Sequence, residues 1–216
     1  MNINDFGNIL TNVSTAFSII AFVVALLRLR LVHSYVIPIL LLVIIAFIVE
    51  LINFAFVIDN ENNLYIFHAY TIIEFTLISF FYLLFYRPYF KSYFMLILNL
   101  VFCVIAYLDY TVNGLESIDN YSISCESIIL TFYALVSFLF IIKNLIFENL
   151  LASTFFWINA AVLFYFSGNL LLFAFSNYLK NNNLDEYYVL WTMIHSFLNI
   201  FFNTFICIGF WKLKAK

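Results

Sequence analysis

The chain has 216 residues and a formal net charge of −3, and 66% of its residues are apolar but only 10% are charged. Soluble domains are typically about 45–50% apolar and about 25% charged, so a soluble fold of this size could not bury so much apolar surface. The composition therefore predicts a single membrane domain over residues 1–216 that has the lipid bilayer as its environment. The basic residues form no large cluster, which argues against nucleic acid as a partner.

Seven apolar stretches are long enough to cross the hydrocarbon core, which requires a helix of about 20 residues. They cover residues 10–31, 36–58, 65–86, 91–110, 122–145, 153–178 and 186–211. Short polar connections separate the stretches, and Pro88 interrupts the chain between the third and the fourth. We therefore expect an all-α fold, a polytopic bundle of seven transmembrane helices.

The basic residues predict how the bundle is oriented. One side of a seven-span arrangement carries Arg28, Arg30, Arg87, Lys91, Lys143, Lys212, Lys214 and Lys216. Only Lys180 falls on the opposite side, where most acidic loop residues lie. The positive-inside rule then places the N-terminus outside and the C-terminus in the cytoplasm. The abundance of Ile, Phe and Asn is typical of a bacterial chain, so we expect a multi-pass protein of the bacterial cytoplasmic membrane.

Ionisable side chains inside the spans are informative because each costs at least about 2.5–3.5 kcal/mol on insertion scales. Within or near the spans lie Glu50, His68, Glu74, Glu126 and His195. At 1.5 Å per residue, Glu50, Glu74 and His195 are each about 13 Å from the outer boundary. Two carboxyl groups at that depth indicate a functional site rather than simple helix packing.

Polar residues of several spans reach the same level of the outer half. Asn169 is about 12 Å deep at the same rise per residue. We expect one functional polar cluster, comprising Glu50, Asn53, His68, Thr71, Glu74, Glu126, Asn169, His195 and Asn199.

Spacing within the spans predicts which faces look inward. Every fourth residue of the last span is polar or aromatic: Trp191, His195, Asn199 and Asn203. Residues four apart share one face of a helix, so this stripe is expected to face similar stripes on neighbouring spans. One such stripe is expected on the fourth span, from Asn99, Cys103 and Tyr107. Asparagines in such stripes also form ordinary hydrogen bonds between helices.

Three functions fit this pattern. A small molecule bound in an outward-facing cluster would make the chain a sensor or receptor-like protein, which then requires a cytoplasmic signalling protein as partner. Alternatively, a divalent metal such as zinc, held by Glu50, His68, Glu74 and His195, would activate water to hydrolyse a lipid. Finally, the glutamates would relay protons in a carrier of protons or another small solute.

We favour the sensor among these functions. The sequence contains no sign of inverted repeats or broken helices, which weakens the carrier hypothesis. The last span, 186–211, contains no lysine, which excludes a retinal Schiff base there. Zinc, as a cofactor, belongs only to the hydrolase hypothesis.

Overall fold

The computed structural model describes residues 3–59, 64–89, 93–114, 120–181 and 185–214. Within these ranges the chain forms seven long α-helices and no β-strand. The helices are α1 (Ile3–Leu27), α2 (Ile37–Asp59), α3 (Leu64–Tyr86), α4 (Tyr93–Asn113), α5 (Asn120–Lys143), α6 (Thr154–Asn181) and α7 (Asp185–Trp211). Each contains an apolar stretch of 19 to 24 residues that is long enough to span a membrane. The predicted all-α, seven-helix fold is therefore confirmed.

Helix α1 begins earlier than the apolar pattern indicates. It starts at Ile3 rather than at residue 10, although its first two turns are rich in polar residues. Gly7 lies in this polar part, and a Cβ atom there would be 3.6 Å from Val189 and 3.7 Å from Met193 of α7. Packing against α7 therefore extends the helix beyond the stretch that hydropathy alone predicts.

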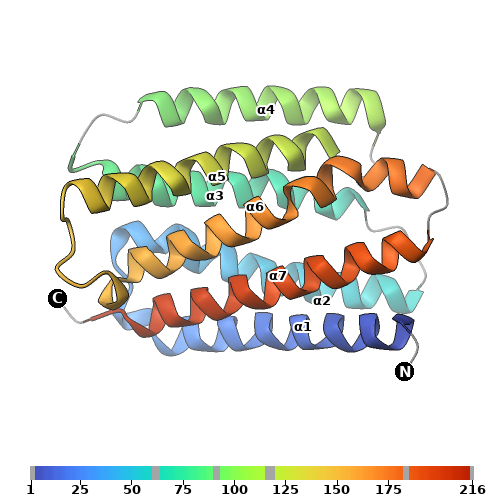
Figure 1. The fold of residues 1–216 in the computed structure, drawn as a ribbon, viewed down its shortest axis with the longest axis horizontal. Helices are drawn as coiled ribbons and strands as arrows, with labels where there is room; N and C mark the ends of the chain where they lie inside the picture. Colours follow the sequence, from blue (N-terminus) through green and yellow to red (C-terminus); the bar gives the residue numbers. More distant parts are fainter. Residues whose placement is uncertain (1–2, 60–63, 90–92, 115–119, 182–184, 215–216) are drawn as a thin grey trace.

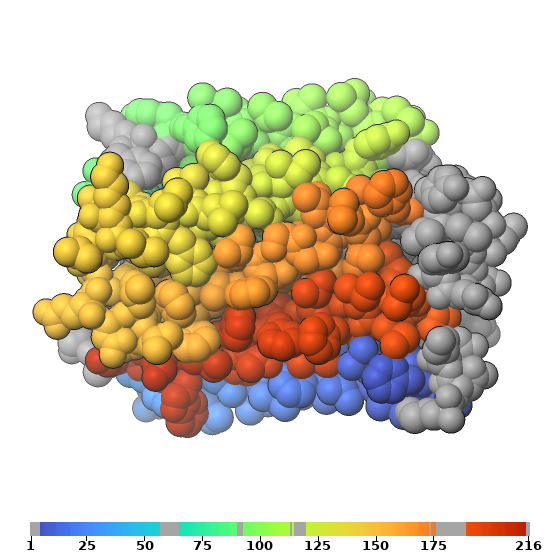
Figure 2. Space-filling model, viewed as in Figure 1, coloured from blue at the N-terminus to red at the C-terminus, as the bar shows by residue number. Residues whose placement is uncertain are grey.

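Six of the helices form a closed ring. Around this ring, α1, α2, α3, α5, α6 and α7 each pack against the next, and α7 packs against α1. Helix α4 lies outside the ring, against α3 and α5 (Figure 1). Figure 2 shows the face on which α4, α5, α6, α7 and α1 follow one another. Because consecutive helices run in opposite directions, the starts of α1, α3, α5 and α7 lie at one end of the bundle (Figure 1).

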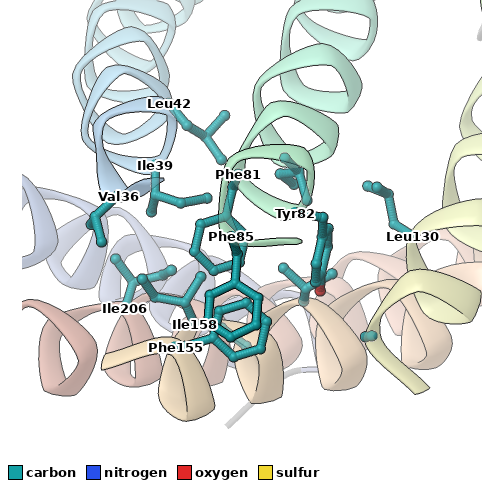
Figure 3. Close-up of a cluster of buried hydrophobic side chains, with 14 of the residues drawn as sticks. Val36, Ile39, Leu42, Phe81, Tyr82, Phe85, Leu130, Phe155, Ile158 and Ile206 are labelled. Atoms are coloured by element: carbon teal, nitrogen blue, oxygen red, sulfur yellow. The ribbon is translucent and has the colours of Figure 1, made fainter. Parts of the chain in front are cut away.

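The interior of the ring near the other end is apolar and rich in aromatic rings. The Phe155 ring of α6 stacks on Phe81 of α3, with ring centroids 5.2 Å apart. Figure 3 shows Ile39 of α2 and Ile206 of α7 in the same cluster as these two rings. The side chains of Phe81, Phe155 and the two isoleucines are buried. This packing closes the ring in the half where α1 ends.

The end of the bundle beside this apolar core carries six of the seven described basic residues, and the seventh, Lys180, lies near the end of α6 on the opposite side. We call the end with the six residues the basic end; it contains Arg28, Arg30, Arg87, Lys143, Lys212 and Lys214. Arg28 also links two helices there, because its guanidinium lies 4.0 Å from the centroid of the Trp211 ring. Lys91 and Lys216 lie outside the described residues.

Large apolar side chains cover much of the outer surface. Phe54, Leu100, Leu139 and Leu171 are each about 70% exposed, and they belong to four different helices. Such a surface would aggregate in water, so the seven apolar helices suggest a lipid bilayer environment and are compatible with a multi-pass integral membrane protein.

Candidate functional site

Polar side chains of four helices meet inside the ring, in the half away from the basic end. We call this group the polar cluster: Tyr70 and Glu74 of α3, Glu126 of α5, Tyr165 and Asn169 of α6, and His195 of α7. Glu74, Glu126 and Asn169 are only 8%, 2% and 0% exposed.

The two tyrosines connect the carboxyl groups within the polar cluster. Tyr70 Oη donates a hydrogen bond of 3.2 Å to Glu74 Oε1. Both Tyr70 and Tyr165 lie within electrostatic range of Glu74 and Glu126. Helices α3, α5 and α6 therefore bring two carboxyl groups and two phenols to one place, although α3 and α6 are not adjacent in the ring.

Two of the four helices supply the polar cluster with a pair of residues four apart. On α3 the pair is Tyr70 and Glu74, and on α6 it is Tyr165 and Asn169. Residues at this spacing lie one above the other on a helix, so both side chains reach the same neighbour. Counted from the first residue of α3, Glu74 lies about 15 Å along the helix axis, close to the middle of a membrane span.

His195 is held by an amide on the neighbouring helix. Asn169 Nδ2 donates to the Tyr165 carbonyl at 2.9 Å, which leaves Asn169 Oδ1 to face His195 Nδ1 at 3.0 Å. An amide oxygen only accepts, so this arrangement puts the imidazole hydrogen on Nδ1. The Tyr165 ring lies 5.9 Å from the imidazole, which connects His195 to the carboxyl groups.

Trp191 fixes the other side of the imidazole. The two rings stack with centroids 5.4 Å apart, and Trp191 Nε1 donates to the Leu172 carbonyl of α6 at 3.0 Å. The sequence pattern aligned Trp191 with His195, but it did not show that both face α6. Aromatic residues make up 22% of the chain, so this tryptophan and the two cluster tyrosines were not among the predicted site residues.

The stripe on α7 was predicted to face similar stripes on neighbouring spans, and its contacts divide between two neighbours, α6 and α1. Asn199 Nδ2 donates to Ser14 Oγ of α1 at 2.8 Å, and Asn203 Nδ2 donates to Ser18 Oγ at 3.2 Å. Because a step of four residues advances about 40° around a helix, the stripe turns by about 120° between residues 191 and 203. Asn199 therefore belongs to the contact between α1 and α7.

Glu50 forms its hydrogen bond away from the polar cluster. Thr15 Oγ1 of α1 donates to Glu50 Oε1 at 2.5 Å, and the glutamate is only partly buried. Thr71 is buried and donates to the Phe67 carbonyl of its own helix at 3.0 Å. Asn53 and His68 are partly buried. The structure thus groups Glu74, Glu126, Asn169 and His195, and it orients Glu50 toward α1.

Helix α4 does not turn its predicted polar stripe toward the interior. Cys103 and Tyr107 are exposed, and Asn99 Nδ2 donates to the Met95 carbonyl of its own helix at 2.8 Å. The helix instead buries Asp109, which lies near its end. Asp109 Oδ2 accepts hydrogen bonds from Ser122 N and Ser122 Oγ, so it satisfies a backbone N–H of the first turn of α5.

The predicted metal ligands do not gather in the part of the chain that the structure describes. Among those residues, no three His, Cys, Asp or Glu side chains lie close enough together to hold an ion. His195 Nδ1 faces Asn169, and Glu50 faces Thr15 on a different pair of helices. This arrangement gives no support to a zinc site.

Comparison with known proteins does not assign the chain to a family. No family model matches it, and neither the curated proteins nor the solved structures contain a significant match.

Proposed function

We propose that this chain is an integral membrane protein that binds a small molecule at the polar cluster and transmits the binding to the cytoplasmic side, as a sensor or receptor does. One observation supports the proposal most: four helices bring buried polar groups to a single level of an apolar bundle. Ionisable groups are expensive at that depth, and they normally mark the path or binding site of a polar solute.

The proposal requires the polar cluster to face the outer half of the membrane. Six of the seven described basic residues lie at the opposite end of the bundle, Lys180 of α6 being the exception, and the positive-inside rule assigns that end to the cytoplasm. In this orientation the N-terminus is outside. Because α7 runs from His195 to the basic end, a shift of this helix would reach a cytoplasmic partner protein.

Binding can favour one arrangement of the helices only if the ligand interacts differently with the two arrangements. A ligand that touches both Glu74 of α3 and His195 of α7 would do so, because these helices are not neighbours in the ring. Tyr165 of α6 lies near both residues, so its surroundings would change when the distance between Glu74 and His195 changes.

A thermal-unfolding screen of the detergent-purified protein tests the proposal. We expect some compounds of a collection of small polar metabolites and lipids to raise the Tm of the wild type. The same compounds should fail to stabilise Glu74→Gln and His195→Gln. Glu50→Gln is the matched control, since it makes the same carboxyl-to-amide change outside the polar cluster and should respond like the wild type. Equal stabilisation of Glu74→Gln would contradict the proposed site, and a collection without any stabilising compound would count against ligand sensing.

The metal-dependent lipid hydrolase remains a separate hypothesis with a direct test. It requires several ligands at one point, and the described residues provide no such group. Elemental analysis of the purified protein should find stoichiometric zinc if that hypothesis is correct.

A further inference from the structure

Buried polar side chains continue from the polar cluster toward the basic end, between α3, α5 and α6. Tyr82 Oη of α3 donates to Asn159 Oδ1 of α6 at 2.7 Å, and Asn159 Nδ2 donates to the Ala134 carbonyl of α5 at 3.1 Å. Tyr133 of α5 packs edge-on against Tyr82, with ring centroids 5.6 Å apart. We call the set the polar column: Ser79, Tyr82, Ser127, Tyr133, Ser137 and Asn159.

The polar column is long enough to extend across much of the hydrocarbon core. Tyr133 lies seven residues after Glu126 on α5, so both share a face, and Ser137 lies eleven residues after Glu126. Eleven residues correspond to about 17 Å, more than half of the about 30 Å hydrocarbon core. Near the basic end, Ser137 faces the Tyr86 hydroxyl, and Tyr86 is the last residue of α3.

Several hydroxyl groups of the polar column are buried without a partner. Ser79 Oγ, Ser127 Oγ and Tyr133 Oη have no hydrogen-bond partner among the described residues. Buried hydroxyls are normally paired with protein or with ordered water. Each is both a donor and an acceptor, so a line of them, bridged by internal water, has the chemistry to pass a proton along.

The outer end of the polar column holds two groups that bind protons. Glu74 and Glu126 face Tyr70 and Tyr165, which are neutral acids rather than cations. The nearest acidic groups on the other helices packed against α3 and α5 have partners elsewhere. They are Glu50 of α2, which bonds Thr15, and Asp109 of α4, which bonds Ser122. Two carboxyl groups that share one site in an apolar bundle repel each other when both are ionised, so the pair favours the uptake of a proton.

We propose that the polar column conducts protons between the polar cluster and the basic end. A proton from outside water first binds a carboxylate of the Glu74–Glu126 pair. Each hydroxyl or water then accepts a proton on an oxygen lone pair as it releases its own, so that one proton crosses and no group is oxidised or left altered. Ile78 of α3 and Leu130 of α5 are fully buried, and in the sequence they lie between the two glutamates and the Tyr82–Tyr133 pair, so this stretch of the path is apolar. This activity goes beyond ligand sensing, which needs only the polar cluster.

Proton flux into sealed liposomes that contain the purified protein tests the path. The vesicles hold potassium and a pH-sensitive dye, and valinomycin creates an interior-negative potential that draws protons inward. We expect the wild type to acidify the lumen faster than protein-free vesicles do. Glu74→Gln should lose this flux to the protein-free level. Tyr133→Phe should lower it several-fold, and it should fold normally because the hydroxyl it removes has no hydrogen-bond partner in the described part of the chain.

Glu50→Gln is the control variant and should conduct like the wild type, because Glu50 bonds α1 outside the path. Wild-type flux equal to that of protein-free vesicles would overturn the proposal, and so would unchanged flux in folded Tyr133→Phe. Failure here is distinguishable from failure of ligand sensing, since flux is measured without any ligand. A Tyr133→Phe protein that has lost flux but is still stabilised by the screened compounds would separate the two activities.

Discussion

Asn169 of α6 holds the imidazole of His195 on α7 in one tautomer, through the 3.0 Å contact between Oδ1 and Nδ1. The second nitrogen, Nε2, then carries no hydrogen and is the hydrogen-bond acceptor of the ring. A polar contact between two helices thereby decides which chemistry the histidine offers to the polar cluster.

Nitrogen-15 NMR of protein labelled at histidine should detect this tautomer. We expect the His195 signals to show a protonated Nδ1 and an unprotonated Nε2, with assignment by comparison with His195→Gln. Asn169→Leu should remove the preference, because the acceptor is lost. Asn99→Leu is the control, since Asn99 bonds only its own helix on α4. A protonated Nε2 in the wild type would contradict the inferred orientation of Asn169.

The contacts between α1 and α7 predict an energetic coupling that is structural rather than functional. Replacing Ser14 or Asn199 by Ala should destabilise the bundle, and the double variant should cost less than the sum. Hydrogen bonds between membrane helices contribute about 0.6 kcal/mol on average and at most about 1.7 kcal/mol, so the coupling should lie in that range. Unfolding of the four proteins under steric trapping measures it. Thr204→Ala is the control, because Thr204 bonds the Ile200 carbonyl of its own helix. Strictly additive effects would refute the contact.

The fold could be predicted from the sequence because a bilayer imposes a simple rule on each helix. A span must be apolar for about 20 residues, and this rule applies to each helix whichever helices pack against it. Apart from α1, the predicted and observed starts of the helices differ by at most two residues. The prediction failed at Ile3, where packing around Gly7 extends the helix.

The arrangement of the site could be predicted only in part, because it depends on which helices are neighbours. Glu74 and Asn169 were predicted at similar depths, since depth follows from position within a span. Nothing in the sequence placed α4 outside the ring. The sequence pattern predicts that Asn99 faces the interior. Its amide instead donates a hydrogen bond to a backbone carbonyl of α4, so Asn99 needs no polar partner across the interface. Glu50 similarly has the expected depth but faces α1.

Gly168 predicts a steric test of the contact between α6 and α7. A Cβ atom at this position would lie 2.7 Å from Cδ2 of Leu198 on α7, as expected from the small residues at 167 and 168. Gly168→Val should lower stability by about 1–3 kcal/mol, the usual cost of overpacking. Leu198→Ala in the same chain should recover part of the loss. Gly7→Ala is the control, because its Cβ would make ordinary contacts. Equal effects of the two glycine substitutions would contradict the close approach.

Asp109 predicts how α4 is held against the ring. Its Oδ2 accepts from Ser122 N at 2.8 Å and from Ser122 Oγ at 2.7 Å, and the carboxylate lies beside the positive end of the α5 dipole. Asp109→Ala should therefore lower the free energy of unfolding by about 1–2 kcal/mol, as the loss of a helix cap does. Asp109→Asn should cost less, since its amide oxygen still accepts but carries no charge. Glu148→Ala is the control at an exposed site. Equal stability of Asp109→Ala and Glu148→Ala would show that Asp109 does not cap α5.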